Sequence, residues 1–340
     1  MMKKQCAHCS RTFPIYPEDM EFYKRIDVPT PTWCPRCREM RRMAWCNEGV
    51  LYARSCAKCG KKIVSQFPEN NPRIVWCIQC WWKDDWDARG YGRYFNFSKY
   101  FFEQFHALEL TVPHACLTLD DMSENSDYTH QAGMNKNCYL IFHATFNENC
   151  LYGYGVKKDK DCVDVHNCFE SELCYESTDV NNCYNVGWSQ DCFDCANSRF
   201  LYDCHGVSDS MLCSGLRNKR FCFLNEQLSE KEYTQKIAQF KISSYTMVQN
   251  LLRQFQVLKE KHTRKFSEMN KTNESTGNHL LNAAYARECF DCRDLDHVAY
   301  SSQLQLNTKD AYDIYQFGIN TELAYEGAMI GHSTYNILFS

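Results

Sequence analysis

The sequence lacks the apolar runs that membrane-spanning and exported proteins carry. None of its apolar runs reaches 18 residues, which is about the length that a membrane-spanning helix needs. The first residues, "MMKKQCAHCS", lead directly into a cysteine pair without an apolar signal-peptide core. We therefore expect a cytoplasmic protein with no membrane span.

The sequence also lacks several common catalytic motifs. It contains no glycine-rich phosphate loop, no nucleophile elbow and no HExxH motif. Carboxylates are plentiful, as at Asp120 and Asp121, and β-helix enzymes that act on polysaccharides use clusters of such groups. Solvated corners between strands explain the same residues. We expect a protein that is not an enzyme, with a β-helix enzyme acting on a carbohydrate-like polymer as one alternative.

Cysteine, in contrast, is abundant. The 340 residues include 23 cysteines, and 44% of the chain is apolar, which is ample for buried cores. In a reducing cytoplasm, cysteines are more often metal ligands or small buried hydrophobes than disulfides. The spacing of the cysteines must therefore distinguish ligands from packing.

Four CxxC turns lie between Cys6 and Cys80. Each turn places two sulfurs close together, and two turns complete a tetrahedral Cys₄ shell with no open position for water. The spacing predicts two structural zinc modules within residues 1–90. Gly60 fits a turn position that needs positive φ. The predicted ligands of the two Zn²⁺ ions are Cys6, Cys9, Cys34 and Cys37, and Cys56, Cys59, Cys77 and Cys80.

Arginines gather after the second of these turns, in "RCREMRRMAW". If residues 36–44 form a helix, Arg38, Arg41 and Arg42 share one face. Residues 1–100 hold 18 Lys and Arg against 10 Asp and Glu, whereas the remainder is acidic. One interpretation is contact with nucleic-acid phosphates. The other, which we favour, is a solvated helix face whose arginines pair with Glu39, Glu48 or the acidic part of the chain.

From residue 138 the cysteines follow a regular spacing. Short-period repetition of this kind is typical of a solenoid. Because Cys162, Cys183 and Cys204 are 21 residues apart, we predict a parallel β-helix of about 18–21 residues per coil over 131–226, and a mainly β chain. Every gap is a multiple of three in the series 138, 150, 162, 168, 174, 183, 192, 195, 204, 213 and 222.

The residues before these cysteines are mostly Asn or Asp. Both tolerate the left-handed conformation that a corner between strands requires. We therefore expect most of the thiols to pack inside the solenoid. A third metal site is the alternative for the two "CFDC" motifs, with the ligands Cys192, Cys195, Cys289 and Cys292.

The cysteine pattern stops at "NEQLSEKEYTQKIAQF". Ser229 and Glu232 form a capping box, and the apolar spacing after them predicts one long helix, or two with a break near Ser243-Ser244, inserted over 227–272. The aromatic-rich segment 91–130 is predicted to connect the zinc modules to the first coil and to cap it. Its stretch "FSKYFFEQFHALEL" reads as an amphipathic helix from Ser98.

The repeats resume after the insertion. Four tyrosines about 10 to 13 residues apart predict a solenoid continuation over 273–340, with Tyr or Ala as internal residues; they are Tyr300, Tyr312, Tyr325 and Tyr335. This end carries no capping segment, so we expect either that another chain covers it, through oligomerisation, or that the sequence is cut short here.

Several phrases resemble an uncharacterised family of zinc-ribbon and Cys-rich repeat proteins that is abundant in candidate-phyla-radiation bacteria. They are "VPTPTWCPRCREMRRMAW", "YGRYFNFSKYFFEQF", "SENSDYTHQAGMNKNCYL", "GLRNKRFCFLNEQLSEKEY" and "CFDCRDL". Members sometimes carry the label "CaiB/BaiF family", a CoA-transferase name that none of these residues supports. The resemblance covers nearly all of the chain and implies the architecture above, but it implies no activity.

Together these features predict a non-enzymatic, zinc-binding scaffold with a β-solenoid body that binds a protein partner. The main alternative is a nucleic-acid-binding protein that uses the basic N-terminal zinc modules.

Overall fold

The computed structural model describes residues 1–340 except 46, 48, 305–306, 317 and 340. The chain divides into two compact units. The terminal unit contains Met1–Asn47 together with Arg264–Ser340, and the central unit contains Glu48–Thr263. As predicted, the chain is mainly β, with 40% of residues in strands and 18% in helices. No helix among the described residues is both long enough and apolar enough to cross a bilayer.

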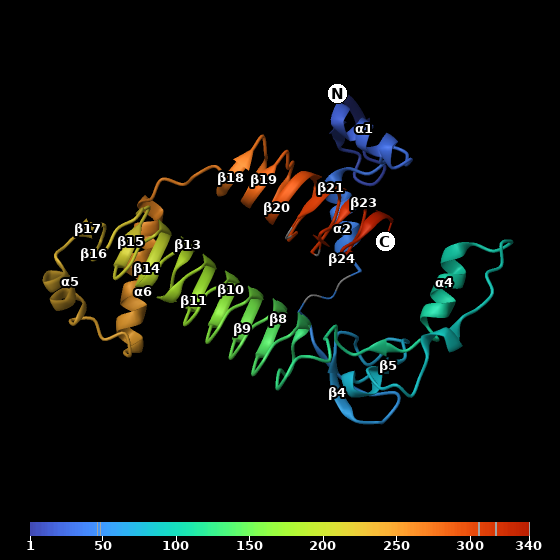
Figure 1. The fold of residues 1–340 in the computed structure, drawn as a ribbon, viewed down its shortest axis with the longest axis horizontal. Coiled ribbons are helices and arrows are strands. Elements are labelled where there is room, and N and C mark those ends of the chain that lie inside the picture. The colour runs from blue at the N-terminus through green and yellow to red at the C-terminus, as the bar shows by residue number, and fades with distance from the viewer. Residues whose placement is uncertain (46, 48, 305–306, 317, 340) are drawn as a thin grey trace. The chain divides into compact units, whose positions relative to one another are not determined.

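The central unit is built around an 11-stranded sheet (Figure 1). Apart from the antiparallel pair β16–β17, the paired strands run parallel. In the pairing register, Val163 lies beside Leu151 on one side and Tyr175 on the other. The strands are β7 (His130–Gly133), β8 (Tyr139–Thr145), β9 (Leu151–Lys157), β10 (Val163–Phe169), β11 (Tyr175–Asn181), β12 (Tyr184–Gly187), β13 (Gln190–Phe193), β14 (Ala196–His205), β15 (Met211–Ser214), β16 (Cys222–Phe223) and β17 (Glu226–Gln227).

Equivalent positions in this register are 12 residues apart along the chain. The longer coil that the cysteine spacing predicted is therefore wrong. A left-handed residue recurs at every third position, as at Asn137, Leu140, His143 and Phe146, where φ is 54°, 50°, 51° and 61°. Each 12-residue segment is thus divided into four runs of three residues. The multiples of three in the cysteine spacing report the length of one run, not the length of the repeat.

The predicted role of Asn and Asp at these left-handed positions is confirmed. Their φ values lie between 49° and 56° at Asn137, Asn149, Asp161, Asn167, Asn182, Asp191, Asp194 and Asp203. Asn side chains also form a hydrogen-bonded row across neighbouring segments. Asn125 donates to Asn137 at 3.0 Å, and Asn149 donates to Asp161 at 2.8 Å. These bonds link equivalent positions in neighbouring segments and help to fix the register.

The cysteines from 138 to 222 are buried, as predicted, in one apolar core. Each follows a left-handed residue, so its side chain points to the interior. Cys150, for example, is fully buried, and its Sγ lies 3.4 Å from the carbonyl oxygens of Glu148 and Asp159. The 22 cysteines that the structure describes are free thiols; Cys46 lies outside the described residues. A small thiol fits a narrow interior in which a larger side chain would overfill the space.

The helical insertion consists of two helices, which confirms the predicted alternative with a break near Ser243-Ser244. They are α5 (Glu230–Ile237) and α6 (Tyr245–Lys261). The Ser229–Glu232 capping box is present, and Ser244 is the N-cap of α6. Leu251 and Phe255 of α6 pack on an apolar cluster contributed by β14, β15 and β16.

The predicted amphipathic helix exists as α4 (Phe101–Glu109). None of its residues is buried, and the Phe102 side chain is 77% exposed. The capping role of this segment therefore remains a prediction. The smaller elements of this part of the chain are β3 (Tyr52–Ser55), β4 (Lys62–Ser65), β5 (Val75–Trp76), α3 (Ile78–Trp81), η1 (Ala88–Tyr91) and β6 (His114–Ala115).

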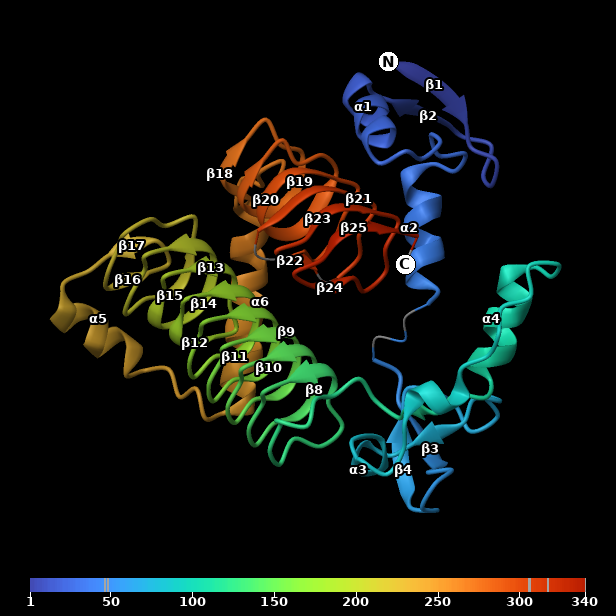
Figure 2. The same cartoon turned by 45° about the vertical axis from the view of Figure 1, so that its right-hand side comes forward.

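The terminal unit contains a second parallel sheet (Figure 2). The spacing of its paired residues varies slightly, as in Met269 with Leu280, Leu280 with Cys292, and Ala311 with Ala324. The sheet contains β18 (Met269–Asn273), β19 (Gly277–Ala284), β20 (Cys289–Ala299), β21 (Thr308–Tyr312), β23 (Glu322–Tyr325) and β25 (Tyr335–Leu338), and beside it β22 (Gly318–Ile319) pairs with β24 (Gly331–His332).

The prediction for the internal residues of this sheet is correct for alanine and wrong for tyrosine. Ala311 and Ala324 lie in its core. Tyr312 and Tyr325 instead pack against Phe22 and Tyr23 of helix α1 (Pro17–Arg25), and Tyr335 is 66% exposed. Tyr312 stacks on Phe22 with ring centroids 3.9 Å apart. A tyrosine ring is too large for the interior, and it covers the outer face where the N-terminal residues dock.

We expect the substitution Cys150→Leu to lower the free energy of unfolding by about 1–3 kcal/mol, because a larger side chain overfills a fully buried position. The control Tyr152→Leu changes a half-exposed residue two positions away and is expected to stay within about 0.5 kcal/mol. Urea unfolding followed by circular dichroism measures both. Equal tolerance of the two changes would show that the interior is not closely packed.

Candidate metal centres

The first four-cysteine group is assembled by a hairpin and a helix. Strands β1 (Met2–Gln5) and β2 (Thr12–Ile15) pair antiparallel, and the turn between them carries Cys6 and Cys9. The turn closes with a hydrogen bond from the Ser10 amide to the Cys6 carbonyl, 2.9 Å. Helix α2 (Pro35–Met43) supplies the other two sulfurs, since Cys34 is its N-cap and Cys37 lies in its first turn.

The second group repeats this construction. The turn between β3 and β4 carries Cys56 and Cys59, while Cys77 is the N-cap of α3 and Cys80 lies within that helix. Gly60 closes the turn with φ of 75°, as predicted, and its amide donates to the Cys56 carbonyl at 2.9 Å.

The sulfur positions in the two groups agree closely. The Cys34 amide lies 3.2 Å from Cys6 Sγ, and the Cys77 amide lies 3.2 Å from Cys56 Sγ. The Cys9–Cys34 sulfur distance is 3.8 Å, and the corresponding Cys59–Cys77 distance is 3.9 Å. In each group the four sulfurs lie within 4.8 Å of one another. Metal–sulfur bonds of about 2.3 Å in a tetrahedron separate the sulfurs by about 3.8 Å. Both groups could therefore hold a metal ion.

The protonation of these thiols is uneven. Burial tends to raise the pKa of Cys6, but hydrogen bonds from the backbone amides of Cys9 and Cys34 lower it to about 6. The pKa of Cys56 is lowered to about 6 by the equivalent amides. Burial raises the pKa of Cys37 and Cys80 to about 12. One thiol in each group is thus prepared as a thiolate, and others must lose a proton when a metal binds.

The two CFDC motifs, which were the alternative third metal site, lie in apolar cores. Cys192 and Cys195 belong to the core of the central unit, and Cys289 and Cys292 belong to the core of the terminal unit. The sulfurs of all four lie near backbone carbonyl oxygens of their own unit, as in Cys195 Sγ to the Cys204 oxygen at 3.2 Å. Both pairs fill space as the other internal cysteines do, so a metal site that they share remains a prediction.

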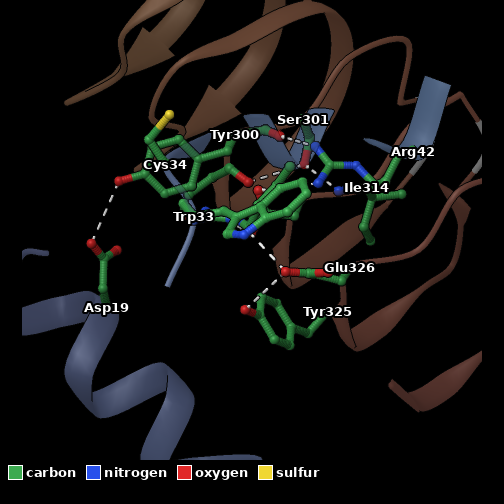
Figure 3. Close-up of polar contacts among 12 residues, drawn as sticks. Asp19, Trp33, Cys34, Arg42, Tyr300, Ser301, Ile314, Tyr325 and Glu326 are labelled. Carbon is green, nitrogen blue, oxygen red and sulfur yellow. Dashed lines mark hydrogen bonds and ion pairs between the residues drawn. The ribbon is translucent and has the colours of Figure 1, made fainter. Parts of the chain in front are cut away.

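The three arginines lie on helix α2, as predicted, but Arg38 and Arg42 are buried whereas Arg41 is exposed. Figure 3 shows Arg42 among its polar contacts. Arg38 is 1% exposed, and its Nη2 lies 2.8 Å from an oxygen of the fully buried Asp313. Arg42 is also buried and lies 3.4 Å from the other Asp313 oxygen, while Arg41 pairs with Glu326. Burial lowers the pKa of Arg42 although Asp313 acts to raise it. The favoured interpretation of a solvated helix face is wrong for Arg38 and Arg42, which are buried. Its other part, pairing of the arginines with carboxylates of the acidic part of the chain, is confirmed; Glu48 lies outside the described residues.

Asp313, the buried carboxylate that pairs with Arg38 and Arg42, could not be identified from the sequence. It is separated from Arg38 by 275 residues, and nothing in its local sequence distinguishes it from other corner aspartates. It stands at a left-handed position, with φ of 65°, immediately after the buried Tyr312.

No protein-family model matches the chain, and no curated protein matches it. The chemistry of the two cysteine groups is therefore the main guide to function.

We expect Asp313→Ala to destabilise the terminal unit by about 3–5 kcal/mol, because Arg38 and Arg42 would remain buried without a counter-charge. The control Asp310→Ala removes a carboxylate that pairs with Arg25 at 2.8 Å on the surface, and should cost at most about 1 kcal/mol. Thermal unfolding of both variants tests this. Similar losses for the two would contradict the importance of the buried pair.

The thiol pKa values predict how metal binding depends on pH. Above pH 6 Cys6 and Cys56 are thiolates, whereas below pH 6 each carries a proton that a metal must displace. With Zn²⁺ as the probe, affinity should fall on acidification, and binding at about pH 5 should release about two more protons per chain than at about pH 8, one from each group. Calorimetric titration in buffers of different ionisation enthalpy counts them. An unchanged count would contradict the lowered pKa values.

Proposed function

We propose that this chain is a non-enzymatic scaffold in which two structural zinc ions hold zinc-ribbon-like modules and a β-solenoid body binds a protein partner. The observation that carries the proposal is the duplicated Cys₄ geometry. Two independent groups place four sulfurs at the separations that a tetrahedral ion requires.

Zinc is the ion that these groups suit best. Zinc accepts four thiolates in a closed tetrahedron, and such sites are structural because no position remains for water or substrate. Calcium and magnesium prefer oxygen ligands and do not match this donor set. Each hairpin is short, so a metal that joins its turn to a helix supplies stability that the small core lacks.

The solenoid interpretation of the body rests on the pairing register. Each 12-residue segment bonds in parallel to the segments before and after it, and left-handed residues divide it into four runs. A stack of this kind grows along one axis and leaves long side faces accessible, and such faces commonly bind other proteins.

One side of the body carries features of a protein-binding face. Tyr128, Tyr139 and Tyr152 form a row with ring centroids 5.4 and 5.8 Å apart, and their exposed fractions are 41%, 37% and 50%. Tyrosine is enriched at protein interfaces because it combines a large apolar ring with a polar tip. We propose that this tyrosine row binds a protein partner that presents an apolar surface.

Metal analysis tests the zinc part of the proposal. The purified chain should contain about two zinc ions, and Cys37→Ser or Cys80→Ser should each reduce the content to about one. Cys222→Ser, which changes a buried cysteine outside both groups, is the control and should retain two. Iron in place of zinc, or equal metal content in all three variants, would overturn the assignment.

The partner-binding part is tested by crosslinking in cells followed by quantitative mass spectrometry. The double variant Tyr139→Ser, Tyr152→Ser should lose specific crosslinked proteins that the control Tyr184→Ser retains. Tyr184 is the same residue type, is 48% exposed and lies outside the row. If both variants retain the same proteins, this face is not the binding surface.

The alternative functions have weaker support. Nucleic-acid binding through Arg38 and Arg42 would require buried, paired groups to become exposed. For an enzyme, the structure offers a shallow groove of about 230 Å³ over β18–β21 that contains Asp294 and Asp296. Asp294 already accepts a hydrogen bond from Asn282 at 2.6 Å, and Asp296 lies 2.7 Å from a ring nitrogen of His297.

A further inference from the structure

A third cluster of sulfurs lies inside the central sheet. Cys162 directly precedes β10, Cys168 lies within β10, and Cys174 directly precedes β11. Their three Sγ atoms lie within 4.8 Å of one another, and all three residues are at most 1% exposed. None of them belongs to either Cys₄ group.

The repeat geometry brings these sulfurs together. Cys162 and Cys174 occupy equivalent positions in neighbouring segments, because the residues that follow them, Val163 and Tyr175, are register partners. Cys168 comes two runs of three after Cys162, so it faces Cys162 across the narrow interior. The cluster therefore has donors from two directions, unlike a simple column of stacked thiols.

We infer that Cys162, Cys168 and Cys174 form a buried three-sulfur site for a monovalent thiophilic cation of the Cu(I) class. Soft thiolate donors select soft ions such as Cu(I). In a trigonal site with metal–sulfur bonds of about 2.3 Å, the sulfurs are about 4 Å apart, which the observed limit of 4.8 Å accommodates. Structural zinc sites need four ligands, and this group, as the structure describes it, supplies three.

The thiols of the cluster lie close to backbone carbonyl oxygens, to which they can donate while they are protonated. Cys162 Sγ lies 3.3 Å from the Lys160 carbonyl oxygen and 3.6 Å from that of Ser171. Cys174 Sγ likewise lies 3.6 Å from the Glu172 oxygen. Other internal thiols, such as Cys150, make the same contacts, so what distinguishes this group is the convergence of three sulfurs within 4.8 Å.

Binding at this site is ligand exchange without electron transfer. The ion arrives as Cu(I), and each thiol that coordinates as a thiolate gives its proton to the buffer. The interior of this unit is closely packed, so the ion enters during folding or through local opening of the neighbouring segments.

The test uses the full zinc-loaded chain, titrated anaerobically with Cu(I) in the presence of a competing chelator. The chain should bind about one Cu(I) with its zinc content unchanged, and X-ray absorption should show three sulfur neighbours. Cys168→Ser should weaken Cu(I) binding by more than about tenfold. The matched control Cys213→Ser, a fully buried cysteine outside the cluster, should bind as the unmodified chain does.

Three results would overturn the inference. The first is loss of zinc in step with copper uptake, which places the copper in the Cys₄ groups. The second is equal Cu(I) affinity of the Cys168 and Cys213 variants. The third is two or four sulfur neighbours in the unmodified chain, a measurement that holds even if the Cys168 variant fails to fold. None of these results depends on whether a protein partner exists, so the scaffold proposal is tested separately.

Discussion

The left-handed backbone residue at every third position is the constraint on which most of this structure depends. For a residue with a side chain this conformation costs about 1–2 kcal/mol, and the chain repeats it dozens of times. Hydrogen bonds between neighbouring segments offset the cost. The Asn149 amide bonds to Lys136 and the Asp161 amide bonds to Glu148, at 2.9 and 3.0 Å. The conformation persists because stacked segments satisfy the backbone of each bend.

This constraint also decides which side chains the interior accepts. Runs of three residues enclose a narrow space, and one side chain per run points into it. Cys, Val, Ala and Ser fill most of these positions, as in Cys174, Val186 and Ser198. Internal cysteines of neighbouring segments lie in contact, so close packing alone can bring several sulfurs together in an arrangement that resembles a metal site. The distinction between filler and ligand then depends on how many sulfurs converge, four in each Cys₄ group and three at Cys162, Cys168 and Cys174.

Much of this could be predicted from the sequence. The CxxC spacing identified the two Cys₄ groups, the Asn and Asp residues before the cysteines identified the left-handed positions, and Ser229 with Glu232 identified the start of a helix. The length of the repeat could not be predicted from the cysteines. They occupy different runs in different segments, as at Cys183 and Cys192, so the distance between them does not measure the repeat.

Contacts between residues that are far apart in the chain could not be predicted from the sequence either. The tyrosines of the second sheet have the spacing of internal residues, but ring size places them outside, against α1. In the same way, the arginine face of α2 has no local sign of its partner. Burial of Asp313 follows only from the docking of two segments that are far apart in the sequence, and that docking is a property of the folded unit.

Because Arg38 and Asp313 are 275 residues apart, their ion pair can form only after nearly the whole chain has been synthesised. During translation the first cysteine module leaves the ribosome well before its carboxylate partner has been made. Throughout that interval the two arginines remain hydrated and the aromatic face of α1 remains uncovered. The nascent chain therefore carries an incomplete unit while the whole central unit is synthesised, and only the arrival of the second sheet converts that unit into a stable one.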